Sequence, residues 1–442
     1  MSGAERLKQV ACAAIDAAQE QLGDVSREIW CKPELAFKEK HAHKILTDFL
    51  DEHGFQTERS YKLETAFKAT YGSRADGPNV SFISEYDALP EIGHACGHNL
   101  IAEVGVGAGL GLMAAMKVAG KPLGQVTVLG TPAEEGPGGK IHLIEAGAFT
   151  DVDVAMMAHP FPDNDFRPVA LARLSLDVVY TGRASHAAGY PWEGVNDLDA
   201  AVTCYQGISC LRQQCKPDWR VHCIILEGGV KVNIIPERAR LHVGVRAPSD
   251  EEMFMLKDKV MNIITSAATS TGCQVEHKLM SKPYSSMLSN EVMVGLFEKN
   301  VSRVQPPEVP TRPGSVFGST DMGNVAHVVP SIHPNFHIGG RAVNHTRDFT
   351  GDAGSPMAQE YTLQIMKALA MTAIDILTDQ ERLQEIKQAF AKSMQNSVCA
   401  AHQRHGSLQR FPFCNVSVDH ILKAMTELEC FGTATDREGM YG

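Results

Sequence analysis

The sequence predicts an α/β protein in which a helix-covered sheet is interrupted by an inserted α+β unit. Strand-like apolar runs alternate with helical patterns between about residues 79 and 160, which favours a mostly parallel sheet with helices on its faces. From Leu171 the pattern changes to strands of alternating polarity and two helices, and it lasts for about 110 residues. The length of 442 residues agrees, because chains of this size usually fold as more than one domain.

Charge and composition are those of an ordinary soluble globular protein. The chain is 44% hydrophobic and 21% charged, and its net charge of −11 argues against nucleic acid as a partner, because a phosphate backbone attracts basic surfaces. Eleven cysteines without regular spacing, behind an N-terminus that lacks a secretory pattern, favour free thiols in a reducing compartment. No run approaches the roughly 18 apolar residues of a membrane helix, so we expect a cytoplasmic protein with no membrane contact.

Apolar periodicity predicts the elements outside the insertion. Residues 4–22 and 39–53 repeat apolar side chains every three and four positions, as amphipathic helices do, and Trp30–Pro33 interrupts the pattern between them. After the insertion, short apolar strands are expected, one of them Val325–Pro330. The last predicted elements are two helices, near residues 353–376 and 380–394. The final segment, 396–442, has little periodicity and no assigned role.

The insertion is expected to form two layers, one of strands and one of helices. Leu174–Tyr180 alternates as a half-exposed strand does. The elements that follow are a helix, two strands, a second helix and a last strand, near residues 196–213, 221–227, 239–246, 250–270 and 273–279.

The segment Glu85–His98 carries a thiol, two imidazoles and a carboxylate in one loop at a strand end. Cys96 and His98 flank a single glycine, so a tight turn can aim both side chains at one ion. Taken alone the pair is a weak signal, because a buried and inert cysteine is as common. His94 in the same loop is more often an ordinary loop histidine than a ligand.

Two further strand ends carry potential ligands. Glu134 and Glu135 follow the strand-like run Gln125–Leu129, and His159 follows Val152–Met157. Adjacent carboxylates are usually only solvated, and a lone histidine is usually structural. Ligands at three successive strand ends nevertheless predict a metal site, since open α/β sheets build sites at the carboxyl edges of their strands. In a dinuclear hydrolase, one carboxylate binds metal while its neighbour takes a proton from water.

Two other patterns are ambiguous. The C-terminal part offers His333, His337 and His345, which spacing alone cannot rank as ligands. Gly105–Gly111 looks like a dinucleotide fingerprint, but it departs from Gly-x-Gly-x-x-Gly and lies inside a helical run over 101–117. We therefore interpret these glycines as small residues that allow close helix packing.

Taken in order, the motifs resemble those of the peptidase M20 family, the aminoacylase and carboxypeptidase-G-type amidohydrolases. The resemblance covers about residues 5–395 and rests on six segments: His94–His98, Thr131–Glu135, Ala158–Pro160, Gly182–His186, Asn233–Pro236 and Asn344–Thr346. It implies a dinuclear-metal peptidase fold. The catalytic domain would comprise residues 1–170 and 282–395, with a lid and dimerisation domain over 171–281 and a tail over 396–442.

The resemblance also implies roles for residues of the catalytic domain. Glu134 would be the general base, and Asp87 would orient a ligand through a hydrogen bond. Many relatives have His-x-Asp where this chain has Glu85-Tyr-Asp87, and those with Cys-Gly-His often carry Asp where Asn99 stands, so the bridging ligand is left open. Two divalent metal ions, zinc or alternatively manganese, would be held by Cys96, His98, Glu135, His159 and His345.

In the lid, three residues match the family's functional positions. His186 matches a histidine that reaches into the partner subunit's site and stabilises the tetrahedral oxyanion. Asn233 and Arg246 match positions that hold the substrate's carboxylate, and arginine suits this task because its planar fork binds carboxylates bidentately. A homodimer is therefore expected, with His186 and Arg246 serving the neighbouring active site.

The activity that the resemblance implies is hydrolysis of the amide bond of small dipeptides. Dipeptides with a basic C-terminal residue, such as β-alanyl-lysine or β-alanyl-ornithine, are the expected substrates, as side products of carnosine-type dipeptide synthesis. Three alternatives stay open: an N-acyl-amino-acid amidohydrolase of other specificity, an enzyme that uses Cys96 as a thiol nucleophile beside His94 or His98, and a metal-free binding protein on the same fold.

Overall fold

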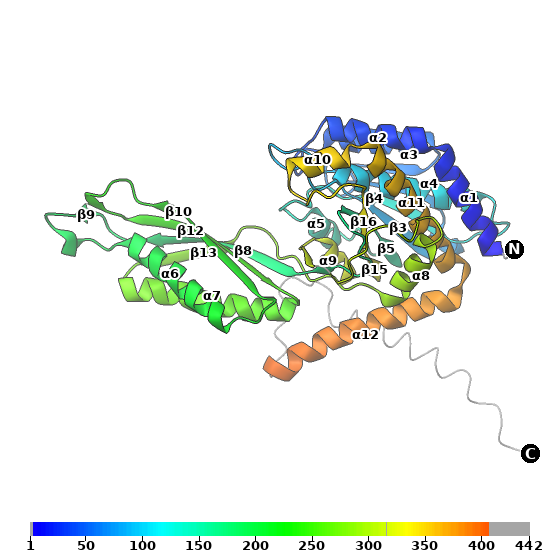
Figure 1. The fold of residues 1–442 in the computed structure, drawn as a ribbon. Coiled ribbons are helices and arrows are strands. Elements are labelled where there is room, and N and C mark those ends of the chain that lie inside the picture. The colour runs from blue at the N-terminus through cyan, green and yellow to red at the C-terminus, as the bar shows by residue number, and fades with distance from the viewer. Residues whose placement is uncertain (1–2, 315, 406–442) are drawn as a thin grey trace, which may run out of the picture.

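The computed structural model describes residues 3–314 and 316–405, which form two bodies joined by long extended segments (Figure 1). The larger body is built from both ends of the described chain. The smaller one is built from the stretch between about residues 172 and 279 and carries its own hydrophobic core.

The larger body contains a six-stranded mixed sheet in the order β1-β2-β4-β3-β5-β15. β4, β3, β5 and β15 run parallel to one another, and β1 and β2 are antiparallel additions at one edge. The six strands are β1 Gln56–Arg59, β2 Phe67–Gly72, β3 Asn79–Ser84, β4 Gln125–Gly130, β5 Val154–Met156 and β15 Ser331–Ile332. Two short parallel pairs lie beside it: β6 His159–Phe161 with β16 Asn335–His337, and β7 Val169–Ala170 with β14 Val316–Gly318.

Helices cover both faces of this sheet. Neighbouring residues of a strand point to opposite faces, and here both faces carry apolar side chains that must be buried. Phe82 belongs to the main apolar cluster, and Ile83 belongs to a second cluster on the other face, together with Leu143 and Met322. The helices of the larger body are α1 Gly3–Ala17, α2 Gln19–Cys31, α3 Lys40–Glu52, α4 His98–Lys117, α5 Gly139–Glu145, α8 Glu291–Val301, α9 Met322–Ala326, α10 Arg347–Ala353, α11 Pro356–Thr378 and α12 Gln380–His405, with the 3₁₀ turn Arg74–Asp76.

Helix α4 corrects one expectation. It is long and apolar enough to cross a membrane, although no segment was expected to approach that composition. Of its apolar window, 89% is buried inside the protein, where α4 packs against α1, α2, α11 and β3. A helix covered on all sides must be apolar all round, so its composition reflects its central position in the core.

The smaller body, hereafter the lid, is a four-stranded antiparallel sheet covered on one face by two helices. The strand order is β10-β12-β8-β13. The lid's elements are β8 Ala172–Thr181, β9 Ser185–His186, α6 Asp197–Leu211, β10 Arg220–Gly228, β11 Ile234–Ile235, β12 Arg238–Ala247, α7 Asp250–Thr271 and β13 Gln274–Leu279, with 3₁₀ turns at Pro191–Glu193 and Arg212–Gln214. The mixed α/β class with a two-layer α+β unit is confirmed, while the exact domain boundaries stay a prediction.

Three predicted elements differ in the structure. The single N-terminal helix is broken at Ala18 into α1 and α2. Val325–Pro330 is not a strand, because the Thr320 hydroxyl accepts a hydrogen bond from Met322 N and a helical turn follows. Helix α12 continues to His405, since neither glycine nor proline occurs between Gln380 and that residue. The predicted tail therefore begins as helix, and its remainder, 406–442, lies outside the described residues.

Candidate metal centre and active site

The candidate metal ligands gather at one edge of the central sheet. β4, β3 and β5 are neighbouring parallel strands, so the loops after their carboxyl ends meet there. These loops supply Cys96 and His98 after β3, Glu134 and Glu135 after β4, and His159 after β5.

Gly97 allows two of these loops to touch. It caps α4 with a left-handed backbone, φ 76°, which glycine adopts without strain. A Cβ at this position would lie 2.4 Å from Cγ of Pro160. The turn between Cys96 and His98 therefore packs directly against the residue after His159.

Short distances connect the ligand candidates. The Cys96 sulfur lies 3.4 Å from Nε2 of His159. Oε1 of Glu135 lies 3.4 Å from Nε2 of His345 and 4.0 Å from Nε2 of His98. Three overlapping groups, each with ligand atoms within 4.8 Å of one another, result: Cys96, His98 and His159; Cys96, Glu135 and His345; and His98, Glu134 and Glu135.

This arrangement fits divalent metal ions. Nε2 of His98, Oε1 of Glu135 and Oε2 of Glu85 are buried atoms without a hydrogen-bond partner among the described residues. Unpaired buried polar atoms are costly, and a metal ion bound by them would remove that cost. Thiolate, imidazole and carboxylate together are the ligand types that zinc sites use.

Hydrogen bonds orient the two buried imidazoles for this role. Nδ1 of His159 donates to the carbonyl of Pro160 at 2.9 Å, and Nδ1 of His98 donates to Oδ1 of Asp87 at 3.1 Å. With the proton on Nδ1, Nε2 of each ring is left with its lone pair toward the cluster. Asp87 also accepts from the backbone N–H of Glu135 at 2.9 Å, so it orients parts of two ligand loops.

The adjacent glutamates are driven to opposite protonation states. Burial and the charge on Glu85 raise the pKa of Glu134 well above its usual range. Burial also acts against ionisation of Glu135, but the His345 imidazole, 3.4 Å away, and the nearby His98 ring outweigh this and lower its pKa to about 2. One carboxylate is therefore suited to hold a charge toward a cation, and its neighbour is suited to carry a proton.

The same environment disfavours the thiol-nucleophile alternative. Cys96 is buried, and burial together with the negative charge of Glu135 raises the pKa of its thiol. Catalytic cysteines need the opposite, a lowered pKa in an electropositive and partly exposed setting. His94 also lies buried and directs Nε2 toward the carbonyl of Ile29 at 3.1 Å.

Among the C-terminal histidines, the structure brings His345 to the cluster. It has a positive φ of 66°, a conformation that is strained for a residue other than glycine, and its backbone N–H donates to Ala95 O at 2.8 Å. The His333 ring stacks edge-on to His159 with centroids 5.7 Å apart. His337 turns away and donates to the carbonyl of Pro162.

No local sequence pattern predicted the buried ionic group beside the general-base candidate. Lys140 is fully buried and donates to Glu85 and, at 2.6 Å, to Asp321. Glu85 marks the position where many relatives carry histidine, so the departure from His-x-Asp was the only available hint. Tyr284, which donates to the Glu134 carbonyl at 2.6 Å, also carried no local pattern.

The structure separates the three lid candidates. His186 and Asn233 lie together at the far tip, where β9 pairs with β11 and Ala187 N donates to Asn233 O (Figure 1). The backbone N–H groups of Ala188 and Gly189 donate to Nδ1 of His186 at 3.2 and 3.1 Å, so Nε2 carries the proton and can donate outward.

Arg246 lies at the opposite end of β12, next to its own catalytic body. A Cβ on Gly318 of β14 would lie 4.0 Å from Nη1 of Arg246. Arg246 therefore lies beside its own subunit's catalytic body, and its expected role in the neighbouring subunit stays a prediction. The ten residues of β12 rise roughly 3.3 Å each, so the two ends of the strand lie about 30 Å apart and contact different parts of the molecule.

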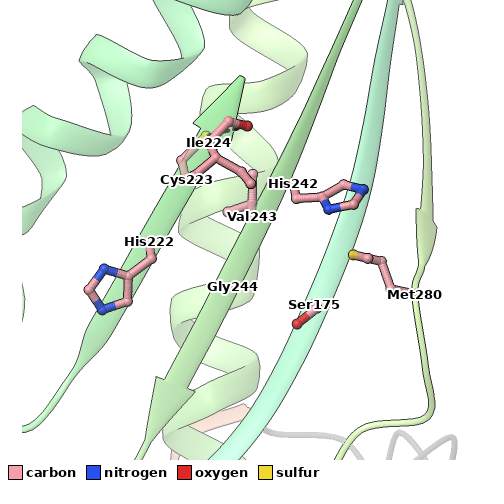
Figure 2. Close-up of a pocket in the computed structure, with 8 residues that line it drawn as sticks. All are labelled: Ser175, His222, Cys223, Ile224, His242, Val243, Gly244 and Met280. Atoms are coloured by element: carbon pink, nitrogen blue, oxygen red, sulfur yellow. Dashed lines mark hydrogen bonds between the residues drawn. The ribbon is translucent and has the colours of Figure 1, made fainter. Parts of the chain in front are cut away.

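The lid face that the helices leave open carries a hollow of about 300 Å³, and Figure 2 shows the residues that line it. Gly244 forms part of its floor, with His222 and His242 on the two sides. None of the predicted site residues lines it, so it is separate from the ligand cluster.

The fold and its buried ligand set define a hydrolase of the metal-dependent type. The sequence profile of peptidase family M20/M25/M40 matches residues 81–367. The human Xaa-Arg dipeptidase is 46% identical over 407 residues, which cover 88% of this chain and 93% of that protein. The chain belongs to the peptidase family M20/M25/M40, and the predicted membership is confirmed.

Solved structures show the same fold at low sequence identity. An aminohydrolase of methicillin-resistant Staphylococcus aureus superposes on this chain with a TM-score of 0.70 at 17% identity. The match covers 84% of this chain and 100% of the aminohydrolase chain. A dinuclear metal-binding M20 peptidase of Bacillus subtilis has a TM-score of 0.61 at 20% identity, covering 81% of this chain and 99% of the other. The combination of a catalytic α/β body and a lid is thus shared by these proteins.

Proposed function

We propose that this protein is a metal-dependent dipeptidase that cleaves the amide bond of small dipeptides with a basic C-terminal residue. One observation carries the chemistry: Glu135 lies in the ligand cluster, while the adjacent Glu134 is buried with a raised pKa. The 46% identity to the human Xaa-Arg dipeptidase supports the substrate class. β-Alanyl-lysine and β-alanyl-ornithine are the substrates to try first.

Two divalent ions, zinc in the first instance, fit the cluster. The proposed ligands are Cys96, His98, Glu135, His159 and His345. A thiol and three imidazoles favour zinc over manganese. Bound there, the ions would acidify a water molecule and polarise the scissile carbonyl.

The residues around the cluster have separate tasks. Glu134 would take the proton of the attacking water and pass it to the leaving amine. Tyr284 fixes the backbone of Glu134 through its hydrogen bond to the carbonyl oxygen. Asp87 keeps His98 in the tautomer that leaves Nε2 toward the cluster.

We also propose a homodimer, in which His186 and Asn233 of one subunit complete the partner's active site. His186 lies at the far tip of the lid, away from its own ligand cluster (Figure 1). The lid edge strand β10 has no neighbour on its outer side among the described residues. Exposed apolar side chains follow this edge and the tip: Ile224, Ile225, Leu226, Val230, Val232, Ile234, Tyr190 and Trp192. Edge strands and apolar patches of this kind support self-association.

A cytoplasmic location is part of the proposal. Eight cysteines of the described residues are free thiols: Cys12, Cys31, Cys96, Cys204, Cys210, Cys215, Cys223 and Cys273. Free thiols persist in reducing compartments. Cell fractionation tests this, and recovery in an oxidising compartment would contradict it.

Metal removal combined with a substrate panel tests the activity. Exhaustive chelation should abolish hydrolysis of β-alanyl-lysine and lower the melting temperature, because an ion that binds only the folded state stabilises it. Zinc should restore both. β-Alanyl-lysine should exceed β-alanyl-glutamate in kcat/KM, and equal rates would reject the basic preference. Full activity in a verified metal-free sample would reject the mechanism.

A further inference from the structure

Three arginines lie side by side across the lid sheet at the end nearest the catalytic body. Strand register pairs Arg246 of β12 with Arg220 of β10 on one side and with Arg173 of β8 on the other. Directly paired residues point to the same face. In β12 the alternate residues Val245 and Ala247 point into the lid core beneath the helices. Arg246 therefore points to the opposite face of the sheet, the face of Gly244, which the helices leave open.

Two of these guanidinium groups have no counter-charge among the residues that the structure describes. In the part of the chain that the structure describes, no ion pair includes Arg173 or Arg246. Nε of Arg173 is buried and lacks a hydrogen-bond partner there. Arg240, six residues before Arg246 in β12 and on the same face, contrasts with them because it binds Asp177 with two hydrogen bonds of 2.7 and 3.1 Å.

The third arginine is already engaged. The Arg220 guanidinium donates to the carbonyls of Pro217 and Trp219. Its strand lies at the sheet edge, and the residue is exposed. Arg173 and Arg246 are therefore the pair that remains free to take an anion.

A chain of contacts connects this pair to the general-base candidate. The Arg173 guanidinium lies 4.0 Å from the ring centroid of Tyr284, and the hydroxyl of the same ring donates to Glu134 O at 2.6 Å. One tyrosine ring therefore separates Arg173 from the backbone of Glu134. Next to Arg246, the segment Gly318–Ser319 adds a buried hydroxyl on Ser319 that has no partner among the described residues.

We propose that Arg173 acts together with Arg246 as a two-arginine clamp for the α-carboxylate of the dipeptide's C-terminal residue. This inference rests on the proposed dipeptidase function and adds a residue to it. Two neighbouring cations repel each other, and a carboxylate placed between them removes that cost while accepting hydrogen bonds from both forks. Both arginines come from the same subunit as Glu134, so this clamp is independent of the partner's His186.

The clamp has a consequence for specificity. A substrate whose C-terminal residue ends in a free carboxylate would neutralise the pair, whereas an amide or a longer peptide would leave two partly buried cations unpaired. Leaving buried charged groups without partners is strongly unfavourable. Arg173 would thus restrict the enzyme to short substrates with a free C-terminus.

A structural role for Arg173 is the competing explanation. Its contact with Tyr284 could serve only to brace the lid against the catalytic body, as cation–π contacts do. A brace would affect every substrate equally. A carboxylate clamp would affect substrates according to their C-terminal charge.

The test compares β-alanyl-arginine with β-alanyl-argininamide, which differ only in the terminal carboxylate. In Arg173→Gln, kcat/KM for the acid should fall roughly ten- to hundredfold, as expected for a hydrogen bond to a charged group. The loss on the amide should be several times smaller. Arg173→Lys, which keeps the charge but not the fork, should recover part of the activity on the acid and carries the test if the glutamine variant fails to fold.

Arg220→Gln is the matched control, because this arginine lies in the same row but uses its guanidinium on backbone carbonyls. It should change neither substrate by more than about twofold. Equal losses on acid and amide in the Arg173 variants would overturn the clamp and favour the brace. Failure of the wild-type enzyme to cleave either compound would instead reject the proposed function itself.

Discussion

The hydroxyl of Tyr284 donates a hydrogen bond of 2.6 Å to the backbone carbonyl of Glu134. Tyr284 lies where the chain returns from the lid, and Glu134 lies in the loop after β4. The Tyr284 ring is 1% exposed and also packs against Gly138, where a Cβ would approach it to 2.9 Å. The junction between lid and catalytic body therefore fixes the backbone of the proposed general base.

The adjacent glutamates should separate in their effects. Glu134→Gln should retain metal while kcat falls by about 10²–10⁴, the usual contribution of a general base. Glu135→Gln should lose metal as well, because Glu135 lies in two of the three ligand groups. Metal content by elemental analysis and steady-state kinetics on β-alanyl-lysine measure both. Near-normal turnover in Glu134→Gln would show that another group is the base.

Gly97→Ala should disrupt the metal centre. The new Cβ would lie 2.4 Å from Pro160 Cγ and would also occupy a left-handed backbone, φ 76°. Gly120→Ala is the control, since Gly120 has a similar φ of 70° but nothing within 4 Å of the added Cβ. The control should lose about 1 kcal/mol from backbone strain alone. Gly97→Ala should lose more and bind less zinc; equal losses with full zinc occupancy would contradict the packing argument.

Mixed dimers should reveal whether His186 acts on the partner. Homodimers of His186→Ala and of Glu134→Gln should each be nearly inactive. A mixed dimer contains one site with both defects and one with neither, so random mixing should restore about one quarter of wild-type activity if loss of an oxyanion donor is nearly complete. Differently tagged chains confirm subunit exchange. No gain over the mean of the parents after exchange would place His186 within its own chain.

Glu103 should make stability fall as pH rises. It is fully buried in α4, and burial, partly offset by the hydrogen bond from Gln359, raises its pKa to about 8 from an ordinary value of 4.5. The folded state therefore binds this proton more tightly than the unfolded state does. The resulting stability is fully present below about pH 4.5 and is lost as pH rises through about 8.

Glu103→Gln removes this titration. The unfolding free energy of the wild type, relative to Glu103→Gln, should decrease by up to about 1.4 kcal/mol per pH unit between pH 5 and 8. Urea unfolding of the metal-saturated proteins at several pH values measures it. The exposed Glu20→Gln serves as control and should stay parallel to the wild type. A pH-independent difference for Glu103→Gln would mean that the carboxyl is ionised in the fold.

The sequence alone determined the α/β class, the inserted unit and most of the candidate cluster. Cys96, His98, Glu134, Glu135 and His159 could be found because each lies in the segment after a predicted strand, and parallel strands bring their carboxyl ends to one edge. The glycine between Cys96 and His98 also predicted the turn at Gly97. These features depend on local conformation, which local sequence encodes.

Only the tertiary structure decided which distant segments meet. It selected His345 over His337, turned Arg246 toward its own catalytic body, and placed His186 at the far tip of the lid. It also paired Lys140 with Asp321 and aligned Arg173 with Arg246. The physical reason is that strand register and the packing of segments far apart in the chain are set by the combined burial of many side chains, and no local periodicity records that sum.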